Sequence, residues 1–339
     1  MNELKAGIIG VGGYGRFVLG ELGRNDAFVV QAIGDRDREL ADDLAQRYEA
    51  TAYDDYRSLI VEENLDVLFL SLPTFLCNEC IRLAAKAGIH VFKEAPVART
   101  LPDALQWSEL MERARCRLHI GAPKRFAPGY LQARQIIKEG QIGPVYLVRA
   151  EQFLNYQGSL EWRGDPGLSG GGVLLEQAYH LIDIMTWIMQ APEKVYSLNA
   201  NCCNKRVAPP YRTEDTAVLI MNFGDGAIGN LTAGWMTGPP SERIIVHGVE
   251  GTIEAAPDQI THYDVAGAVR RREEFDVSEE WLIAQQIRQF ADSLLDEEVK
   301  PISSARDHYS NIAVVEAAYL SARTQLPEPL KVYGSLVEL

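Results

Sequence analysis

The run Gly10-Val11-Gly12-Gly13-Tyr14-Gly15 constrains this chain more than any other segment. Apolar residues before the run predict a buried parallel strand over 6–9, and the apolar stripe after it predicts a helix. A Gly-x-Gly-x-x-Gly turn between strand and helix lets a pyrophosphate approach the backbone, and the start of the helix offers N–H donors to the anion. We therefore expect Gly10, Gly12, Gly13, Tyr14 and Gly15 to form a dinucleotide site.

An acidic residue follows at the distance that such a site requires. A second apolar run, over 28–33, ends at Gly34-Asp35. A carboxylate at this point binds the adenosine ribose diol of NAD and repels the 2′-phosphate of NADP. Arg36 and Arg38 come directly after it and could instead embrace that phosphate. We expect NAD as the cofactor, with Arg36 at the site and NADP as the alternative.

Strands and helices alternate through the first third of the chain, and the strands are apolar throughout. This pattern is typical of a parallel sheet with helices on both faces. Ligands of such sheets bind outside the carboxyl ends of the strands. Two further strand ends therefore join the candidate cofactor site, at Leu72, Pro73 and Thr74 and at Glu94, Ala95 and Pro96. We expect a doubly wound Rossmann domain over 1–123.

The pattern changes after about residue 144. Short apolar runs are joined by tight turns such as Gly224-Asp225-Gly226, which predicts a mostly antiparallel sheet. One long helix is expected over 173–189, and two more near 280–295 and 305–323. We assign 124–339 to a second α+β domain with an open sheet that binds substrate and mediates oligomerisation. We expect the helix near 305–323 to pack back on the first domain.

Composition excludes several classes of partner. The chain has 47 acidic and 33 basic residues and a formal charge of −14, which argues against nucleic acid or an anionic membrane as partner. No apolar run approaches the ~20 residues that span a bilayer. Five cysteines at irregular spacing form no disulfide framework, and we expect a cytoplasmic protein. Cys77 and Cys80 lie at the start of a predicted helix without a second pair, so we expect helix packing and no metal.

The segment after Gly170-Gly171-Gly172 carries the clearest catalytic candidates. On a helix, Glu176 and His180 are four residues apart and share one face. The other faces are apolar, so the helix is predicted to be mostly buried. A buried ionisable pair must be hydrogen-bonded or line a wet cavity. A carboxylate that holds an imidazole in place gives a general base, but a purely structural pair accounts for the spacing equally well.

The chain resembles the glucose–fructose oxidoreductase, inositol dehydrogenase and MocA family of nicotinamide enzymes over about 4–323. The resemblance rests on the following segments: 10–15, Asp35, 72–74, 88–91, 94–96, Arg125-Phe126, 140–143, Trp162-Arg163 and 170–183. It implies a Rossmann domain followed by a domain whose open sheet makes oligomer contacts, hence a homodimer or homotetramer. It also implies a nicotinamide ring at the junction of the two domains.

The resemblance further implies roles for individual residues. His180 takes or gives the alcohol proton, and Glu176 orients His180 or binds substrate. Trp162, Arg163 and Lys124 are candidates for the substrate pocket. Arg125 joins the cofactor site. The substrate implied is a sugar, a cyclitol or a similar polyol, which exchanges a hydride with the nicotinamide ring.

Two departures from the family pattern bear on this reading. The usual Glu-Lys-Pro reads Glu94-Ala95-Pro96, which removes a cation near the substrate oxygen. Neighbouring strand residues point to opposite faces, which disfavours Lys93 as its replacement, so we expect Lys124 to supply the charge. The second departure is at position 176, where Glu176 replaces the aspartate that is usual in the family.

Three readings stay open. The first is an NAD(P)-dependent oxidoreductase that acts on a polyol. The second is a glycoside hydrolase or lyase that retains its NAD. The third is a dinucleotide-binding protein without catalysis. The sequence specifies neither the substrate nor the favoured direction of the reaction.

Overall fold

The computed structural model describes residues 3–330 and divides into two compact units. The first unit comprises the chain up to Ala98, together with Pro102–Pro123 and Ser278–His308. The second comprises Arg99–Leu101, Lys124–Val277 and Tyr309–Leu330.

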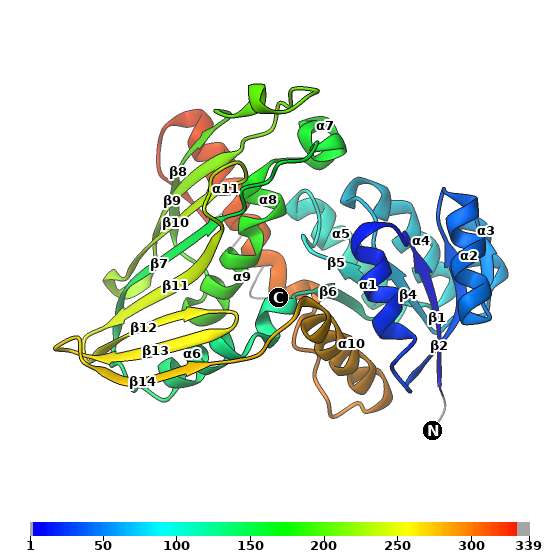
Figure 1. Ribbon diagram of the computed structural model, residues 1–339, viewed down its shortest axis with the longest axis horizontal. Coiled ribbons are helices and arrows are strands. Elements are labelled where there is room, and N and C mark those ends of the chain that lie inside the picture. The colour runs from blue at the N-terminus through cyan, green and yellow to red at the C-terminus, as the bar shows by residue number, and fades with distance from the viewer. Residues whose placement is uncertain (1–2, 331–339) are drawn as a thin grey trace. The chain divides into compact units, whose positions relative to one another are not determined.

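The first unit contains, within residues 3–330, one parallel sheet of six strands in the order β3-β2-β1-β4-β5-β6 (Figure 1). Its strands are β1 (Leu4–Ile9), β2 (Phe28–Gly34), β3 (Thr51–Tyr53), β4 (Val67–Leu70), β5 (His90–Glu94) and β6 (Leu118–Gly121). Its helices are α1 (Gly13–Leu22), α2 (Arg38–Tyr48), α3 (Tyr56–Glu62), α4 (Cys77–Ala87), α5 (Leu101–Arg113) and α10 (Glu279–Leu295), with short 3₁₀ turns η1 (Thr74–Leu76) and η6 (Ala305–His308). This is the predicted Rossmann sheet, and the predicted fold class is confirmed.

Helix α10 belongs to the core of the first unit. Its residues Ile283, Ile287 and Phe290 are fully buried and join the cluster formed by α1 and the sheet. Phe290 lies edge-on to Phe69 of β4, with ring centroids 6.2 Å apart. The sequence placed this segment with the residues after 124, because an apolar stripe predicts a helix but not the surface that the helix covers.

The second unit is built on a sheet of nine strands among the described residues, in the order β14-β13-β12-β11-β7-β10-β9-β8-β15. Its strands are β7 (Val145–Phe153), β8 (Lys194–Ala200), β9 (Thr216–Asn222), β10 (Ile228–Gly234), β11 (Ser241–Gly248), β12 (Gly251–Ala256), β13 (Gln259–Asp264), β14 (Val269–Glu274) and β15 (Glu328–Pro329). Only β7 and β10 pair in parallel within this described sheet, so the expectation of a mostly antiparallel sheet is confirmed.

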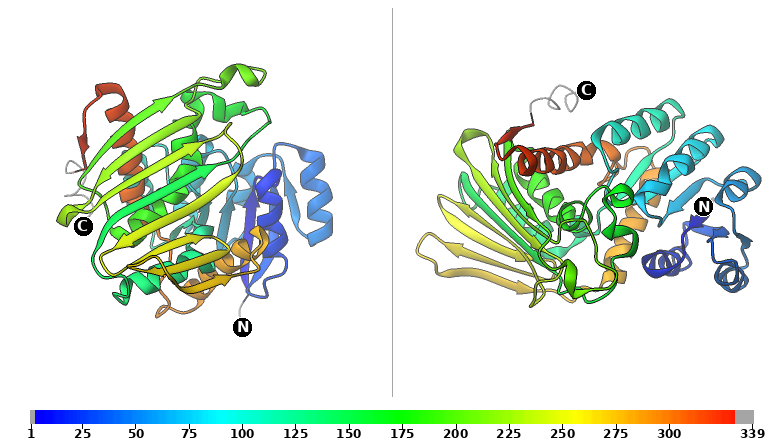
Figure 2. Two further views of the ribbon diagram at one scale, coloured as in Figure 1. Left: turned by 60° about the vertical axis from the view of Figure 1, so that its left-hand side comes forward. Right: turned by 90° about the horizontal axis from the view of Figure 1, so that it is seen from above.

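Helices cover one face of this sheet, and the other face carries none among residues 3–330 (Figure 2). The helices of this unit are α6 (Pro128–Lys138), α7 (Pro166–Ser169), α8 (Val173–Glu176), α9 (Ala178–Met189) and α11 (Tyr309–Thr324), with 3₁₀ turns η2 (Pro123–Phe126), η3 (Glu161–Gly164), η4 (Asn204–Arg206) and η5 (Gly224–Gly226). Helix α11 packs on β8 and α9. Alternate strand residues such as Val148, Leu219 and Leu231 are fully buried beneath the helices.

The long helix expected over 173–189 is interrupted. Helix α8 ends at Glu176 and α9 begins at Ala178, because Gln177 between them has φ −116° and ψ −54°. Glu176 and His180 therefore do not lie on one continuous helix.

None of the helices that the structure describes is both long and apolar enough to traverse a lipid bilayer.

Candidate active site

The glycine turn forms the sharp connection between β1 and α1. Gly15 packs against the turn so closely that a Cβ there would overlap the carbonyl oxygen of Gly10. Gly12 is the N-cap of α1, no side chain caps the helix, and its first turn has no acidic residue. A Cβ on Gly12 or Gly13 would meet no atom within 4 Å. Open space above uncapped N–H donors suits a pyrophosphate, so these residues fit the predicted cofactor.

Asp35 lies at the carboxyl end of β2, beside the glycine turn. Its Oδ2 accepts a hydrogen bond from the backbone N–H of Val11 at 2.9 Å, and its Oδ1 accepts one from Asp37 at 3.0 Å. The carboxylate is thus fixed next to the turn, where a ribose diol would reach it. Arg36 follows it as an exposed residue.

Two further strand ends reach the same edge of the sheet, because β4 and β5 run parallel to β1. Leu72, Pro73 and Thr74 follow β4, and Glu94 ends β5. The predicted cofactor residues of the first unit thus lie along one edge. Arg125 is the exception, since it belongs to the second unit.

Glu94 and Tyr14 form a protonated cluster at this edge. Burial raises the pKa of Glu94 to about 8, and the Glu279 carboxylate raises it too, while Lys93 opposes the shift. Burial and the nearby Glu94 and Glu279 carboxyl groups raise the pKa of the Tyr14 phenol well above its usual value. The Glu94 carboxyl lies over Gly121, where an added Cβ would be 2.6 Å from Oε2. At neutral pH Glu94 is therefore mainly a hydrogen-bond donor rather than an anion.

The Lys93 side chain curves back to the Glu94–Pro96 segment, which strand alternation did not predict. Its side chain is buried, and its Nζ donates to the carbonyl oxygens of Glu94 and Pro96, both at 2.7 Å. A third contact joins Nζ to Thr74 Oγ1 at 3.4 Å. The ammonium therefore fastens the Glu94–Pro96 segment to the end of β4.

In the second unit, Lys124 and His180 lie close together. Burial, followed by the Lys124 ammonium, lowers the pKa of His180 to about 4, against the opposing charges of Asp183 and Glu242. The imidazole is therefore neutral at physiological pH and can accept a proton from an alcohol.

Glu242 is a site residue that the sequence did not reveal. It forms a short ion pair with Lys124, whose side chain is 16% exposed. Tyr130 donates its hydroxyl hydrogen to Glu242 Oε1 at 2.9 Å, and Gln152 donates to Oε2 at 3.3 Å. Glu242 also lines a hollow of about 690 Å³ in the second unit. No local sequence pattern predicts this pair, because Lys124 and Glu242 are 118 residues apart in the chain.

Glu176 pairs with Arg163, which was also predicted for the substrate pocket. Arg163 Nε lies 3.2 Å from Glu176 Oε2, and the Glu176 side chain is 8% exposed. The Arg163 guanidinium also stacks over the Trp162 ring, 4.4 Å from its centroid. The structure thus joins three of the predicted substrate residues in one group. The charges that act on His180 come instead from Lys124, Asp183 and Glu242.

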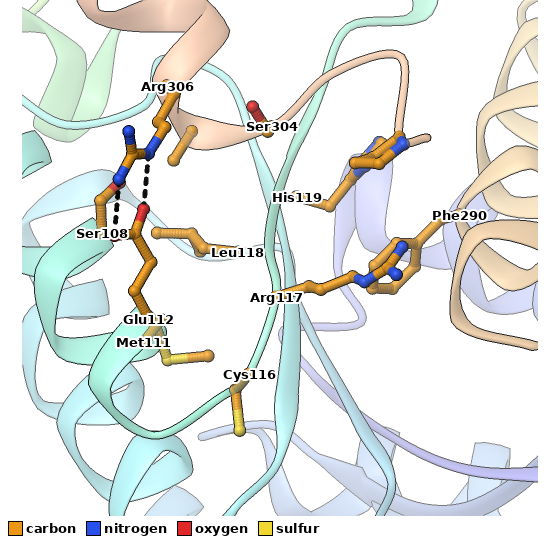
Figure 3. A pocket seen from close by; sticks show the side chains of 12 residues that line it. Ser108, Met111, Glu112, Cys116, Arg117, Leu118, His119, Phe290, Ser304 and Arg306 are labelled. Atoms are coloured by element: carbon orange, nitrogen blue, oxygen red, sulfur yellow. Dashed lines mark hydrogen bonds and ion pairs between the residues drawn. The ribbon is translucent and has the colours of Figure 1, made fainter. Parts of the chain in front are cut away.

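A pocket of about 180 Å³ in the first unit lies away from the glycine turn and Asp35 (Figure 3). Its walls include Cys116, Arg117 and Leu118, which lie at the amino end of β6. On one side Arg306 forms a bidentate ion pair with Glu112, at 2.7 and 2.8 Å. The glycine turn and Asp35 lie at the carboxyl ends of the strands, so this pocket belongs to the opposite edge of the sheet. Across residues 3–330, no group of three or more His, Cys, Asp or Glu side chains is arranged to hold a metal ion.

Family models match most of the chain. A model described as an oxidoreductase family with an NAD-binding Rossmann fold matches residues 4–122, and a model of the GFO/IDH/MocA C-terminal domain matches residues 130–254.

Individual relatives agree with these matches. The chain is 25% identical over 315 residues to scyllo-inositol 2-dehydrogenase (NAD(+)) of Bacillus subtilis, covering 88% of each chain. It is 26% identical over 231 residues to myo-inositol 2-dehydrogenase of Thermotoga maritima, covering 67% of each. The fold is similar to that of levoglucosan dehydrogenase in complex with NADH and levoglucosan, with a TM-score of 0.87, 20% identity, and coverage of 97% of this chain and 100% of that chain.

Proposed function

Because this chain belongs to the Gfo/Idh/MocA family of oxidoreductases, we propose that it transfers a hydride between NAD and a secondary alcohol or ketone of a sugar, cyclitol or similar polyol. The observation that carries the proposal is the neutral His180 beside the Lys124–Glu242 pair, in a chain whose other unit has an NAD-binding Rossmann fold. The three relatives reported above are all dehydrogenases, which favours the first of the three readings.

The residues of the second unit take the following parts. Bound NAD supplies or accepts the hydride. His180 takes the hydroxyl proton as the carbonyl forms and returns it in the reverse direction. Arg163 and Glu176 bind substrate hydroxyl groups, and Trp162 provides an apolar wall. Because Glu176 is already paired with Arg163, the two side chains present a charged donor and a charged acceptor together.

Lys124 takes the place of the cation that Ala95 removes. Its charge is available only in part, because Glu242 neutralises it in the ion pair. A substrate oxygen that binds to the Lys124 ammonium competes with Glu242 for it. We therefore expect Glu242 to accept a hydrogen bond from a neighbouring substrate hydroxyl group when its ion pair with Lys124 is broken. Lys124→Ala should lower kcat/KM by about a hundredfold, whereas Lys138→Ala, at an exposed lysine of α6, should leave it unchanged. Full activity of the Lys124→Ala enzyme would remove this role.

The decisive experiment is a screen of sugars and cyclitols with NAD and NADP that records net reduction of the cofactor. We expect turnover with at least one polyol and an NADH product. His180→Asn should then lower kcat by about 10²–10⁴-fold while the Kd for NADH changes less than about twofold. A wild-type protein that binds NADH but reduces none of it with any polyol would overturn the proposal.

The acidic limb of the pH profile gives a second check on His180. An unperturbed histidine would become protonated near pH 6.5, and activity as a base would fall below that value. Because the pKa of His180 is lowered to about 4, it stays neutral across the weakly acidic range. We expect its contribution to kcat/KM to persist down to about pH 5.

The uncovered face of the second unit supports a homo-oligomer. Leu198 of β8 lies opposite Val218 of β9, and Ile220 lies on the same face two residues on. These side chains are 56%, 40% and 52% exposed, and Ile228 of β10 is 51% exposed beside them. We propose that two copies pair through this face, as dimers or as dimers within a tetramer. Sedimentation velocity should show the dimer, and Ile220→Glu should release monomers.

The five free cysteines and the excess of acidic residues suit the cytoplasm. Fractionation of cells that express the protein would check this location. A fully processed secreted form would contradict it.

A further inference from the structure

The segment before β9 is fastened to two separate parts of the second unit. The backbone N–H of Arg212 donates to the carbonyl oxygen of Gly164 at 2.8 Å. Thr213 Oγ1 donates its hydrogen to the carbonyl oxygen of Arg163 at 2.9 Å. The next residue, Glu214, accepts at its carbonyl oxygen from the N–H of Val173, also at 2.9 Å. Three successive residues thus connect η3, which carries Arg163, with α8, which carries Glu176.

The Glu214 carboxylate makes the stronger of these connections. Its Oε1 accepts from the N–H groups of Gly172 at 2.9 Å and Leu174 at 3.1 Å, and Oε2 also lies 2.9 Å from the Gly172 nitrogen. Tyr319 of α11 donates its hydroxyl hydrogen to Oε1 at 2.8 Å. Every partner is a donor: burial raises the pKa of Glu214, and the hydrogen bonds from Tyr319, Leu174 and Gly172 oppose that rise. We call Glu214, Tyr319 and the three glycines 170–172 the glycine clamp.

The glycines of the clamp are needed for close approach. A Cβ on Gly171 would overlap the hydroxyl oxygen of Tyr319, and one on Gly172 would overlap the carbonyl oxygen of Glu214. Gly170 has φ +85°, a conformation that side chains disfavour. The backbone can therefore enter the clamp only as glycine, and residues 170–172 form a tightly held turn.

The clamp fixes the position of Glu176. Helix α8 has four residues, so its last residue lies one turn from the Glu214 carboxylate, and the interruption at Gln177 separates it from α9. Arg163 is fixed independently through Thr213. The Arg163 Nε to Glu176 Oε2 distance of 3.2 Å is thus set from both sides by residues 213 and 214.

We propose that Glu214 is a positioning residue for the substrate, which acts through Gly172 and Leu174 to hold Glu176 against Arg163, with Tyr319 as its support. The proposal rests on the function proposed above, because it assigns the clamped pair to binding polyol hydroxyl groups. Glu214 acts through the backbone of Gly172 and Leu174 in this arrangement, and Tyr319 acts through Glu214. A shift of about 1 Å in a positioned group can cost about a hundredfold in rate. Loss of the clamp should therefore weaken the interaction of Glu176 and Arg163 with the substrate.

The test uses the full chain and the variant Glu214→Gln. Its amide oxygen can keep the Oε1 contacts to Leu174 and Tyr319, but its NH₂ group replaces Oε2 against the Gly172 N–H, so backbone hydrogen exchange at Gly172 should accelerate about tenfold or more. With the polyol identified in the screen, KM should rise about tenfold while kcat falls less than about threefold. The Kd for NADH should stay within about twofold.

The matched control is Glu316→Gln. Glu316 lies one turn before Tyr319 on α11, and its Oε1 accepts from the backbone N–H of Leu101 at 2.9 Å, away from α8. This variant should leave both exchange at Gly172 and the KM unchanged. A variant that only loses folded enzyme lowers kcat and leaves KM as it was, so the KM readout separates positioning from stability.

The milder variant Tyr319→Phe keeps the test informative if Glu214→Gln does not fold. It removes one donor and leaves the backbone contacts of Glu214, so exchange at Gly172 and the KM should each rise about threefold. Unchanged exchange in both variants, or faster exchange with an unchanged KM, overturns the proposal. A wild type that turns over no polyol overturns the proposed function and the role of Glu214 in it, and the exchange data then still report whether the clamp itself exists.

Discussion

Arg125 and Asp183 form a bidentate ion pair, with Arg125 Nε 2.9 Å from Asp183 Oδ2 and Nη2 2.6 Å from Oδ1. Each side chain is 3% exposed. Asn311 of α11 donates to Asp183 Oδ1 at 2.7 Å, which adds a third element to the network. Arg125 follows Lys124 directly, and Asp183 lies three residues after His180 on α9. The pair therefore fixes the two proposed catalytic side chains relative to each other, and the predicted contact of Arg125 with the cofactor stays a prediction.

Removing the charge of Asp183 should destabilise the protein strongly. Asp183→Asn leaves the buried Arg125 guanidinium without its counter-charge, which costs about 3–5 kcal/mol in comparable pairs. Glu109→Gln is the control, because Glu109 and Arg113 form an exposed pair on α5 that should contribute less than about 0.5 kcal/mol. Urea unfolding of both variants measures the difference. Equal losses in the two variants would show that the buried pair contributes no more than an exposed one.

Much of the first unit was predictable because its signals are local. The glycine turn, the strand before it and Asp35 occur within 35 residues, and each has a geometric requirement that few residues meet. The alternation of apolar strands and helices then specifies a parallel sheet. These features predicted the fold class and the edge of the sheet at which Asp35 meets the turn.

The remaining features depend on contacts between distant residues. The stripe of α10 predicted a helix, but its partners in β4 and β5 are far away in the chain. Glu242 pairs with Lys124 and Glu214 clamps Gly172 through the fold alone. Lys93 shows a different limit: alternation gives the direction of a Cβ, whereas the long side chain curves back to the carbonyl oxygens of Glu94 and Pro96.

Two glycines of α1 should respond in opposite ways to the same substitution. Gly15→Ala puts a methyl group into the Gly10 carbonyl oxygen, and such overpacking costs about 1–3 kcal/mol. Gly20→Ala, one turn further along the same helix, meets no atom within 4 Å and should stabilise the protein by about 0.5–1 kcal/mol. Urea unfolding measures the change in the free energy of unfolding for each variant. Fluorescence titration should show weakened NADH binding for Gly15→Ala alone. A stabilised Gly15→Ala protein would contradict the packing described here.

The stability of the protein should depend on pH through Glu94. Its folded pKa is raised from 4.5 to about 8, so the folded state holds a proton that the unfolded chain releases. The stabilisation is complete below the unfolded pKa and is lost as pH rises through about 8. Glu94→Gln stays neutral throughout, so its stability relative to the wild type should rise between about pH 5 and about pH 8.5. Parallel stability curves for the two proteins in urea would rule out a protonated Glu94.

Asp35 should determine the preference for NAD over NADP. Its carboxylate is held beside the turn by the Val11 N–H and would repel a 2′-phosphate, while the exposed Arg36 could attract one. Asp35→Asn keeps an acceptor for Val11 and removes the charge, so the ratio of the Kd for NADPH to that for NADH should fall about tenfold, equivalent to about 1.4 kcal/mol. Asp43→Asn, at an exposed residue of α2, should leave the ratio unchanged. Fluorescence titration measures both constants, and tighter binding of NADPH than NADH by the wild type would show that Arg36 outweighs Asp35.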